Sequence, residues 1–142
     1  MRKIIYAIIL CVAALVLYQF TGSAQGNNNQ STEITQQEVL SLIRSHVTGK
    51  AGMNNVYTIY DPLYKLNRRL QILRLENWVR KADGKYYSRG LFQDLDNNEV
   101  LDIDFYVGYN DKGALGVLDK SIHSVGGKAR YYYDGEGKKI PL

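Results

Sequence analysis

Residues 88–107 read SRGLFQDLDNNEVLDIDFYV, and this stretch decides the fold. Apolar and polar side chains alternate before and after the asparagine pair at 97–98, and such a pair is typical of a tight turn. Alternation with a period of two indicates a strand with one apolar face. The stretch therefore predicts an antiparallel hairpin with Phe92 opposite Ile103, and with Asp102 on the other face.

A second turn signal, the DG pair at 83–84, precedes this hairpin and predicts another strand before it. A two-residue turn there places Val79 opposite Ser88 and Leu75 opposite Phe92. The two predicted hairpins put the same apolar side chains on one face of a sheet: Leu73, Leu75, Val79, Phe92, Ile103, Phe105 and Val107.

An apolar sheet face needs a cover, and an amphipathic helix predicted at residues 36–48 supplies one. Thr35 and Glu38 have the spacing of a capping box, and Gly49 is expected to end the helix as a left-handed C-cap. The apolar stripe of the helix consists of Val39, Leu40, Ile43 and Val47. Residues 51–68 fit either a strand or a helix, and we favour a short turn followed by a strand.

Further turn signals at 110–113 and 126–127 extend the meander. The sequence thus predicts an α+β fold, in which an N-terminal amphipathic helix packs on a curved antiparallel β-meander of about five strands. The outline is similar to that of cystatin-like and nuclear-transport-factor-like folds, as an analogy of shape that does not define function. Residues 35–142 are expected to form this single domain.

Residues 1–24 have the layout of a secretory signal peptide. Two basic residues precede an uncharged apolar run, and small residues suit a cleavage after Ala24. An uncleaved membrane anchor at 4–20 is the alternative, although the run is short for the ~20 residues of a spanning helix. Residues 25–34 read as a polar spacer. We therefore expect export across a bacterial inner membrane, to the periplasm or the extracellular space.

The chain has 18 basic and 14 acidic residues with interspersed signs, and this balance gives no argument for a nucleic-acid partner. Cys11 is the only cysteine and lies in the apolar run, so the predicted domain has no disulfide and no thiolate chemistry. We expect no cofactor, and contact with a membrane only through the N-terminal segment if that segment is not cleaved.

The predicted registers place aromatic and basic side chains together on the sheet face opposite the core. A solitary tryptophan ringed by arginine and tyrosine has the composition of an interaction hot spot. The candidate binding residues of this predicted aromatic–basic face are Trp78, Arg89, Tyr87, Tyr106, Arg74, Arg80, Asp102 and Asp104. The alternative is an ordinary solvated face, since cross-strand charge pairs and stacked Arg–Trp pairs are common on sheets. The tyrosines at 131–133 are a second candidate for recognition.

Three catalytic or metal-binding alternatives lack required residues. Asp102 and Asp104 lie about 6.6 Å apart on a strand, in the range used for glycoside hydrolysis, but Tyr106 stands where a further glutamate is needed. Residues 94–98 resemble the start of a calcium loop that lacks its glycine and glutamate. Asp, Ser and His alternate at 119–123, where parallel side chains do not converge as in a catalytic triad. We predict no catalytic residue and no metal ligand.

The resulting hypothesis is an exported, non-enzymatic binding or envelope-interaction domain that uses the aromatic–basic face. Its partner would be an envelope protein or a small ligand. The alternative is a cone-shaped α+β domain that binds, or slowly transforms, a small apolar or sugar ligand in a pocket between helix and sheet. A structural accessory of a membrane complex is a third class, favoured if the N-terminal segment stays as an anchor.

Overall fold

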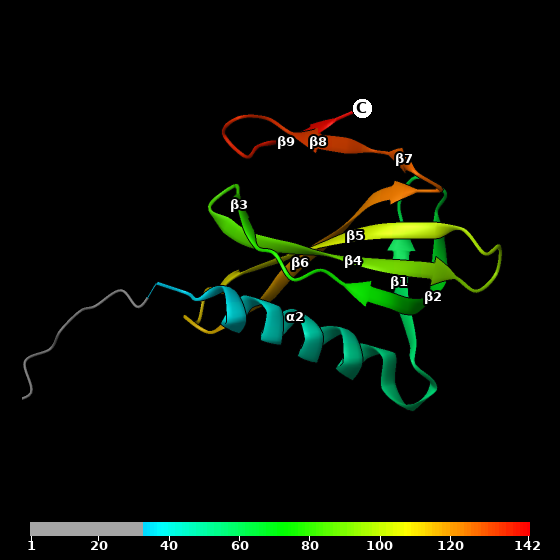
Figure 1. The fold of residues 1–142 in the computed structure, drawn as a ribbon, viewed down its shortest axis with the longest axis horizontal. Helices are drawn as coiled ribbons and strands as arrows, with labels where there is room; N and C mark the ends of the chain where they lie inside the picture. The colour runs from blue at the N-terminus through cyan, green and yellow to red at the C-terminus, as the bar shows by residue number, and fades with distance from the viewer. Residues whose placement is uncertain (1–32) are drawn as a thin grey trace, which may run out of the picture. The chain divides into compact units, whose positions relative to one another are not determined.

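The computed structural model describes residues 33–142, and residues 34–142 build three layers. Figure 1 shows helix α2 (Gln36–Ala51) on one side of a curled antiparallel sheet and a C-terminal hairpin on the other side. The predicted signal peptide, and the predicted spacer up to residue 32, lie outside the described residues. Between residues 33 and 142, no helix combines the length and apolar character needed to cross a bilayer.

Helix α2 begins at the predicted capping box. The Glu38 N–H donates to the Thr35 hydroxyl at 3.2 Å, and the Thr35 N–H donates to the Glu38 carboxylate at 2.8 Å. These two bonds satisfy backbone donors that a helix start leaves unpaired. The predicted C-cap is wrong, because Gly49 stays helical and the helix ends where Gly52 takes a φ of 60°.

The sheet has seven antiparallel strands in the order β1-β2-β4-β5-β6-β7, with β3 paired to β4. They are β1 (Val56–Asp61), β2 (Leu66–Leu75), β3 (Arg80–Ala82), β4 (Lys85–Asp94), β5 (Val100–Tyr109), β6 (Leu115–Val125) and β7 (Lys128–Ala129). Two further strands, β8 (Tyr131–Tyr133) and β9 (Lys139–Pro141), form the separate C-terminal hairpin. The short 3-10 helix η1 (Gly52–Asn54) connects α2 to β1.

The predicted α+β class and the curved antiparallel sheet are confirmed. The predicted strand number is too low, because irregular residues divide two of the expected strands. Residues 76–79 separate β2 from β3, and Arg130 separates β7 from β8. Residues 51–68 fitted either a strand or a helix in the sequence. In the structure β1 is followed by a turn at 62–65 and then by β2, so most of this segment is strand and turn.

The hairpin β4–β5 has a register two residues away from the predicted one, with Phe92 opposite Leu101. Its turn is wider than a two-residue turn at 97–98, because the Asp94 N–H donates to the Glu99 carbonyl at 2.8 Å. A shift by two residues leaves every side chain on its predicted face. The predicted apolar side chains of β4 and β5 therefore do face the core, although their pairing is wrong.

Strand β2 departs from the predicted pattern at a bulge around Leu73. Ile72 packs against the core in place of Leu73, which is 48% exposed. Leu75 pairs with Gly90 and not with the predicted Phe92. Residues 76–79 absorb this difference before β3, whose register with β4 is the predicted one.

Side chains fill the space between α2 and the sheet. The helix contributes Val39, Ile43 and Val47 of its predicted stripe, whereas Leu40 is not part of this core. The sheet contributes the apolar face of β1, β2, β4, β5 and β6. The buried members of this core are Val39, Ile43, Val47, Ala51, Tyr57, Ile59, Leu70, Phe92, Leu101, Ile103, Phe105, Val107 and Ile122.

Candidate functional site

The sheet face that was predicted to be exposed is covered by the β8–β9 hairpin (Figure 1). Three of the eight predicted binding residues are buried, with exposed fractions of 0%, 4% and 6%: Asp104, Tyr87 and Tyr106. Three are partly buried: Trp78, Arg89 and Asp102. Only two are exposed: Arg74 and Arg80. The prediction of one continuous exposed surface is therefore wrong, because the end of the chain folds back over this face.

The buried Asp104 carboxylate fastens the hairpin to the sheet. Arg89, directly opposite on β4, donates to it through Nε at 2.7 Å and through a terminal nitrogen at 3.2 Å. The Tyr131 and Tyr133 hydroxyls donate to it at 2.8 and 3.0 Å, and Tyr133 also shares a hydrogen bond with Tyr106. We call these five residues the Asp104 cluster.

Burial raises the pKa of both the Tyr131 and the Tyr133 phenol, and the negative charge of Asp104 adds to each shift. Both phenols therefore stay protonated and remain donors at neutral pH. A carboxylate that accepts several hydrogen bonds from charged and neutral donors is well satisfied in a buried site. The cluster thus fastens the hairpin to the sheet, beside the contact between the Tyr133 and Tyr87 rings, whose centroids lie 4.7 Å apart.

His123 lies at a bulge of β6, where the register with β5 shifts. Its ring packs edge-on against Tyr131 with centroids 4.8 Å apart, and its Nδ1 lies 3.8 Å from the Asp104 carboxylate without a hydrogen-bond partner among the described residues. Burial lowers the pKa of His123, and the positive charge of Arg89 lowers it further. His123 is thus a neutral packing ring at neutral pH.

A second buried carboxylate, Asp61, positions Arg130. Arg130 donates to it through both terminal nitrogens at 2.8 and 2.9 Å, and Arg68 donates through Nε at 2.7 Å. Arg68 also donates to Asp94 at 2.8 Å. Burial opposes the charged form of Asp61, but the hydrogen bonds from Arg130 and Arg68 outweigh it and hold the pKa of Asp61 below its usual range. We call these four residues the Asp61 network.

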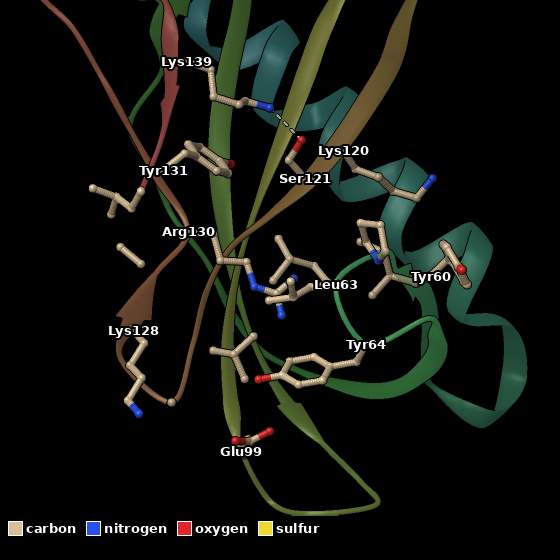
Figure 2. Close-up of a pocket in the computed structure, with 17 residues that line it drawn as sticks. Tyr60, Leu63, Tyr64, Glu99, Lys120, Ser121, Lys128, Arg130, Tyr131 and Lys139 are labelled. Atoms are coloured by element: carbon tan, nitrogen blue, oxygen red, sulfur yellow. Dashed lines mark hydrogen bonds between the residues drawn. The ribbon is translucent and has the colours of Figure 1, made fainter.

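A cleft of about 920 Å³ opens between β1, the turn at 62–65, β6 and the C-terminal hairpin (Figure 2). The strands β1 and β6 both border this cleft but do not pair with each other. Its lining residues are Ile59, Tyr60, Pro62, Leu63, Tyr64, Glu99, Lys120, Ser121, Ile122, Val125, Gly126, Lys128, Ala129, Arg130, Tyr131, Lys139 and Leu142. We call it the β1–β6 cleft.

The two buried carboxylates set one wall of this cleft. Asp61 holds Arg130, and Asp104 holds the next residue, Tyr131. Lys139, on the facing strand of the hairpin, lies over the Tyr131 ring at 4.6 Å and donates to Ser121 on β6 at 2.7 Å. Figure 2 shows this hydrogen bond at one end of the cleft. The wall is therefore built from fixed side chains.

The side chains of the lining carry an excess of positive charge, with four basic side chains against one acidic side chain, that of Glu99. Lys120 and Lys128 are exposed, and their ammonium groups form no ion pair within residues 33–142. Glu99 already accepts hydrogen bonds from Asn97 at 2.7 Å and from Arg68 at 3.3 Å. The contact with Arg68 therefore offsets much of the negative charge of Glu99, and the cleft as a whole attracts anions.

The cleft also presents apolar surface. Ile59 and Ile122 are 4% and 6% exposed and belong to the core, so they form a firm apolar base. Leu63 and Tyr64 are 65% and 61% exposed in the turn after β1. The guanidinium groups of Arg68 and Arg130 stack on the Tyr64 ring, which gives this exposed side chain a defined position.

The Lys139 ammonium lies 4.7 Å from the Tyr106 ring centroid and 4.6 Å from that of Tyr131, and cation–π contacts of this kind hold the end of a lysine side chain in place. Across the part of the chain that the structure describes, no group of three or more His, Cys, Asp or Glu side chains could hold a metal ion.

Sequence reasoning missed the cleft because its residues come from distant segments. The tyrosines at 131–133 were the one signal, and Tyr131 does line the cleft. The basic residues at 120, 128, 130 and 139 read as ordinary surface charges until the hairpin and β6 are brought together. Comparisons with known protein families, with curated proteins and with solved structures found no match to this chain.

Proposed function

We propose that this protein is a binding module for a small molecule that carries an anionic group on an apolar body. The observation that supports this most is the β1–β6 cleft, with four basic residues and an apolar base in one concavity of about 920 Å³. Small-molecule sites have this size and this mixture of apolar lining with a few placed polar groups.

The charges of the lining favour an anionic ligand. Lys120 and Lys128 have no counter-ion among the described residues, so an anion gains their attraction without breaking an existing pair. Arg130 is already paired with Asp61, and its role is to shape the wall. The exposed Leu63 and Tyr64 can cover an apolar chain, at about 25 cal/mol for each Å² removed from water.

Isothermal titration calorimetry tests the proposal with dodecyl phosphate as the anionic probe and dodecyl maltoside as the neutral one, both kept monomeric. We expect the anionic probe to bind more tightly, and its affinity to fall as salt is added. The variant Lys120→Ala/Lys128→Ala should lose about tenfold in affinity, which is about 1.4 kcal/mol.

The matched control is Lys50→Ala/Lys112→Ala, which removes two exposed lysines outside the cleft. Its affinity should equal that of the parent protein. Equal binding of the neutral and anionic probes, or an equal loss in both double variants, would reject an anion-binding cleft.

We also propose that the protein works after export, in the periplasm or at the cell envelope. The support is the sequence pattern of residues 1–24, in which two basic residues, an uncharged apolar run and small residues follow one another. Intact-mass analysis of the envelope fraction should find a chain that begins at Gln25. Recovery of a chain that retains Arg2 would favour the membrane anchor instead.

A second candidate function is recognition of an envelope protein by the uncovered rim of the predicted aromatic–basic face. Trp78 remains partly exposed, with the Arg80 guanidinium 5.2 Å from its ring and exposed Arg74 near the end of β2. A pull-down with the parent protein should recover one defined partner that Trp78→Ala/Arg80→Ala does not recover. Equal recovery by both proteins would reject this candidate.

A further inference from the structure

We propose that Ser121 and Lys139 form the subsite that receives the anionic group, a phosphate monoester or a carboxylate, and that the ligand thereby clamps the C-terminal hairpin onto the sheet. This inference rests on the proposed function of the β1–β6 cleft and assigns the position of the ligand's head within it.

The first observation is the hydrogen-bonding state of Ser121. Lys139 Nζ donates to Ser121 Oγ at 2.7 Å, so this oxygen already acts as an acceptor. The Ser121 hydroxyl hydrogen has no acceptor within the described chain. A serine hydroxyl carries one donor hydrogen as well as its acceptor sites. Ser121 therefore has a donor left for an oxyanion in the cleft that it lines.

The second observation is the environment of Lys139. This side chain is partly buried, and its ammonium group lies 4.7 Å from the Tyr106 ring centroid and 4.6 Å from that of Tyr131. Its only hydrogen-bond partner in the described part of the chain is a neutral hydroxyl, and no carboxylate lies within 4.0 Å of it. A partly desolvated cation without a counter-ion is costly, and an arriving anion relieves that cost.

The third observation is preorganisation. The two aromatic faces and the Ser121 oxygen fix the Lys139 ammonium before any ligand arrives, and the Asp104 cluster fixes Tyr131 in turn. A donor pair that is already in place loses little conformational entropy on binding. Lys120, the neighbour of Ser121 on β6, adds an exposed positive charge at the same end of the cleft (Figure 2).

The coupling to the hairpin follows from where the two residues lie. Ser121 belongs to β6 of the sheet, and Lys139 belongs to β9 of the separate hairpin. An anion that bonds both side chains adds a second fastening between these elements, in addition to the Asp104 cluster. By linkage, ligand binding then stabilises the docked hairpin against local opening.

Calorimetric titration with dodecyl phosphate tests the subsite in Ser121→Ala, Lys139→Gln and Lys139→Arg. We expect at least about a tenfold loss of affinity for Ser121→Ala and Lys139→Gln, equivalent to about 1.4 kcal/mol, and partial recovery for Lys139→Arg. Lys112→Ala, which is remote from the cleft, should bind as the parent does. Circular dichroism verifies that each variant is folded.

Lys128→Ala tests whether the anionic group binds at Lys128 instead, since Figure 2 shows Lys128 away from the Ser121–Lys139 pair. If Lys128→Ala loses more affinity than Ser121→Ala and Lys139→Gln, the subsite is wrong while the anion-binding cleft stands. If dodecyl phosphate fails to bind the parent protein, the proposed function itself fails.

Amide hydrogen exchange tests the clamp. The amides of Asp134 and Leu142 report on the hairpin, because they donate to the Lys138 and Arg130 carbonyls. Saturating dodecyl phosphate should slow their exchange several-fold in the parent protein, and this protection should be absent in Ser121→Ala at the same occupancy. Unchanged exchange in the liganded parent would overturn the clamp.

Vesicle binding distinguishes a lipid head group from a free amphiphile as the source of the anionic group. Co-sedimentation with phosphatidic acid vesicles, which display a phosphate monoester, that is lost in Ser121→Ala would identify a lipid head group as the source of the anion. Binding of soluble dodecyl phosphate without co-sedimentation would identify a free amphiphile. Binding to neither would reject the subsite and the cleft together.

Discussion

Arg130 donates hydrogen bonds from both of its terminal nitrogens to the fully buried carboxylate of Asp61, at 2.8 and 2.9 Å, although the two residues lie 69 positions apart in the chain. The pair joins the end of β1 to the C-terminal segment. Arg68 on β2 also donates to this carboxylate, so that Asp61 accepts hydrogen bonds from two guanidinium groups. The position of one cleft wall therefore depends on a single buried acid.

Asp61→Asn should destabilise the protein by about 3–5 kcal/mol, because it removes the charge that two partly or fully buried arginines share. Urea denaturation measures this change. The control is Asp96→Asn, which breaks the exposed pair with Arg69 and should cost less than about 1 kcal/mol. Similar costs for both variants would mean that the Asp61 network is solvated.

The same residue predicts acid sensitivity. The pKa of Asp61 is lower in the folded than in the unfolded chain, so its contribution to stability is complete above the ordinary carboxyl pKa of about 4 and is lost as the pH falls below that value. Urea midpoints measured from about pH 6 to about pH 3 should fall less steeply for Asp61→Asn than for the parent. Parallel curves would contradict this assignment.

Alkaline titration should reveal the buried tyrosines. Burial raises the pKa of Tyr57 to about 12, and it also raises the pKa of Tyr131 and Tyr133. Stability from these neutral phenols is complete below the ordinary tyrosine pKa of about 10 and is lost as the pH rises above it. Phenolate absorbance should therefore show a late, cooperative phase, and this phase should be smaller in Tyr57→Phe than in the parent protein.

Gly90→Ala tests the observed β2–β4–β5 packing. A Cβ at Gly90 would lie 2.6 Å from the Phe92 ring and 3.0 Å from Leu75, so the substitution should cost about 1–3 kcal/mol. At Gly116 an added Cβ meets no atom within 4 Å, and Gly116→Ala should be close to neutral. Thermal denaturation of both variants measures the difference, and equal stabilities would contradict this packing.

Phe105→Ala and Leu73→Ala test which side of the sheet faces the helix. Phe105 is fully buried, so its truncation should cost about 3–5 kcal/mol, while Leu73 is 48% exposed and its truncation should cost less than about 1 kcal/mol. A large cost at Leu73 would contradict the bulge and would favour the regular strand that the sequence pattern predicts.

Local sequence patterns were enough to predict where helix α2 begins and which side chains of β4 and β5 share a face. The capping box depends on residues three positions apart, and side-chain alternation survives a register error of two residues. The bulge at Leu73 and the wide turn before Glu99 could not be predicted in this way. At this turn Asp94 accepts from the Asp96 N–H at 2.9 Å and also from Arg68, a residue of β2, at 2.8 Å.

The candidate site was missed for a related reason. Asp104 reads as a solvated residue of an alternating strand, and the charge pattern around it does not reveal that Tyr131 and Tyr133 return to cover it. Polar side chains that satisfy each other across the fold follow no periodicity in the sequence. The hairpin is short and tyrosine-rich, so its buried face has no aliphatic pattern to recognise.

Arg130 and Tyr131 are consecutive residues, yet each is tied to a different buried carboxylate. An insertion or deletion of one residue between β7 and β8 would turn one of these side chains away from its partner. The turn at 134–138 is different, because Asp134 closes it locally by accepting from the amides of Glu136 and Lys138. Designed changes of chain length should therefore be tolerated at this turn and rejected at the junction before Tyr131.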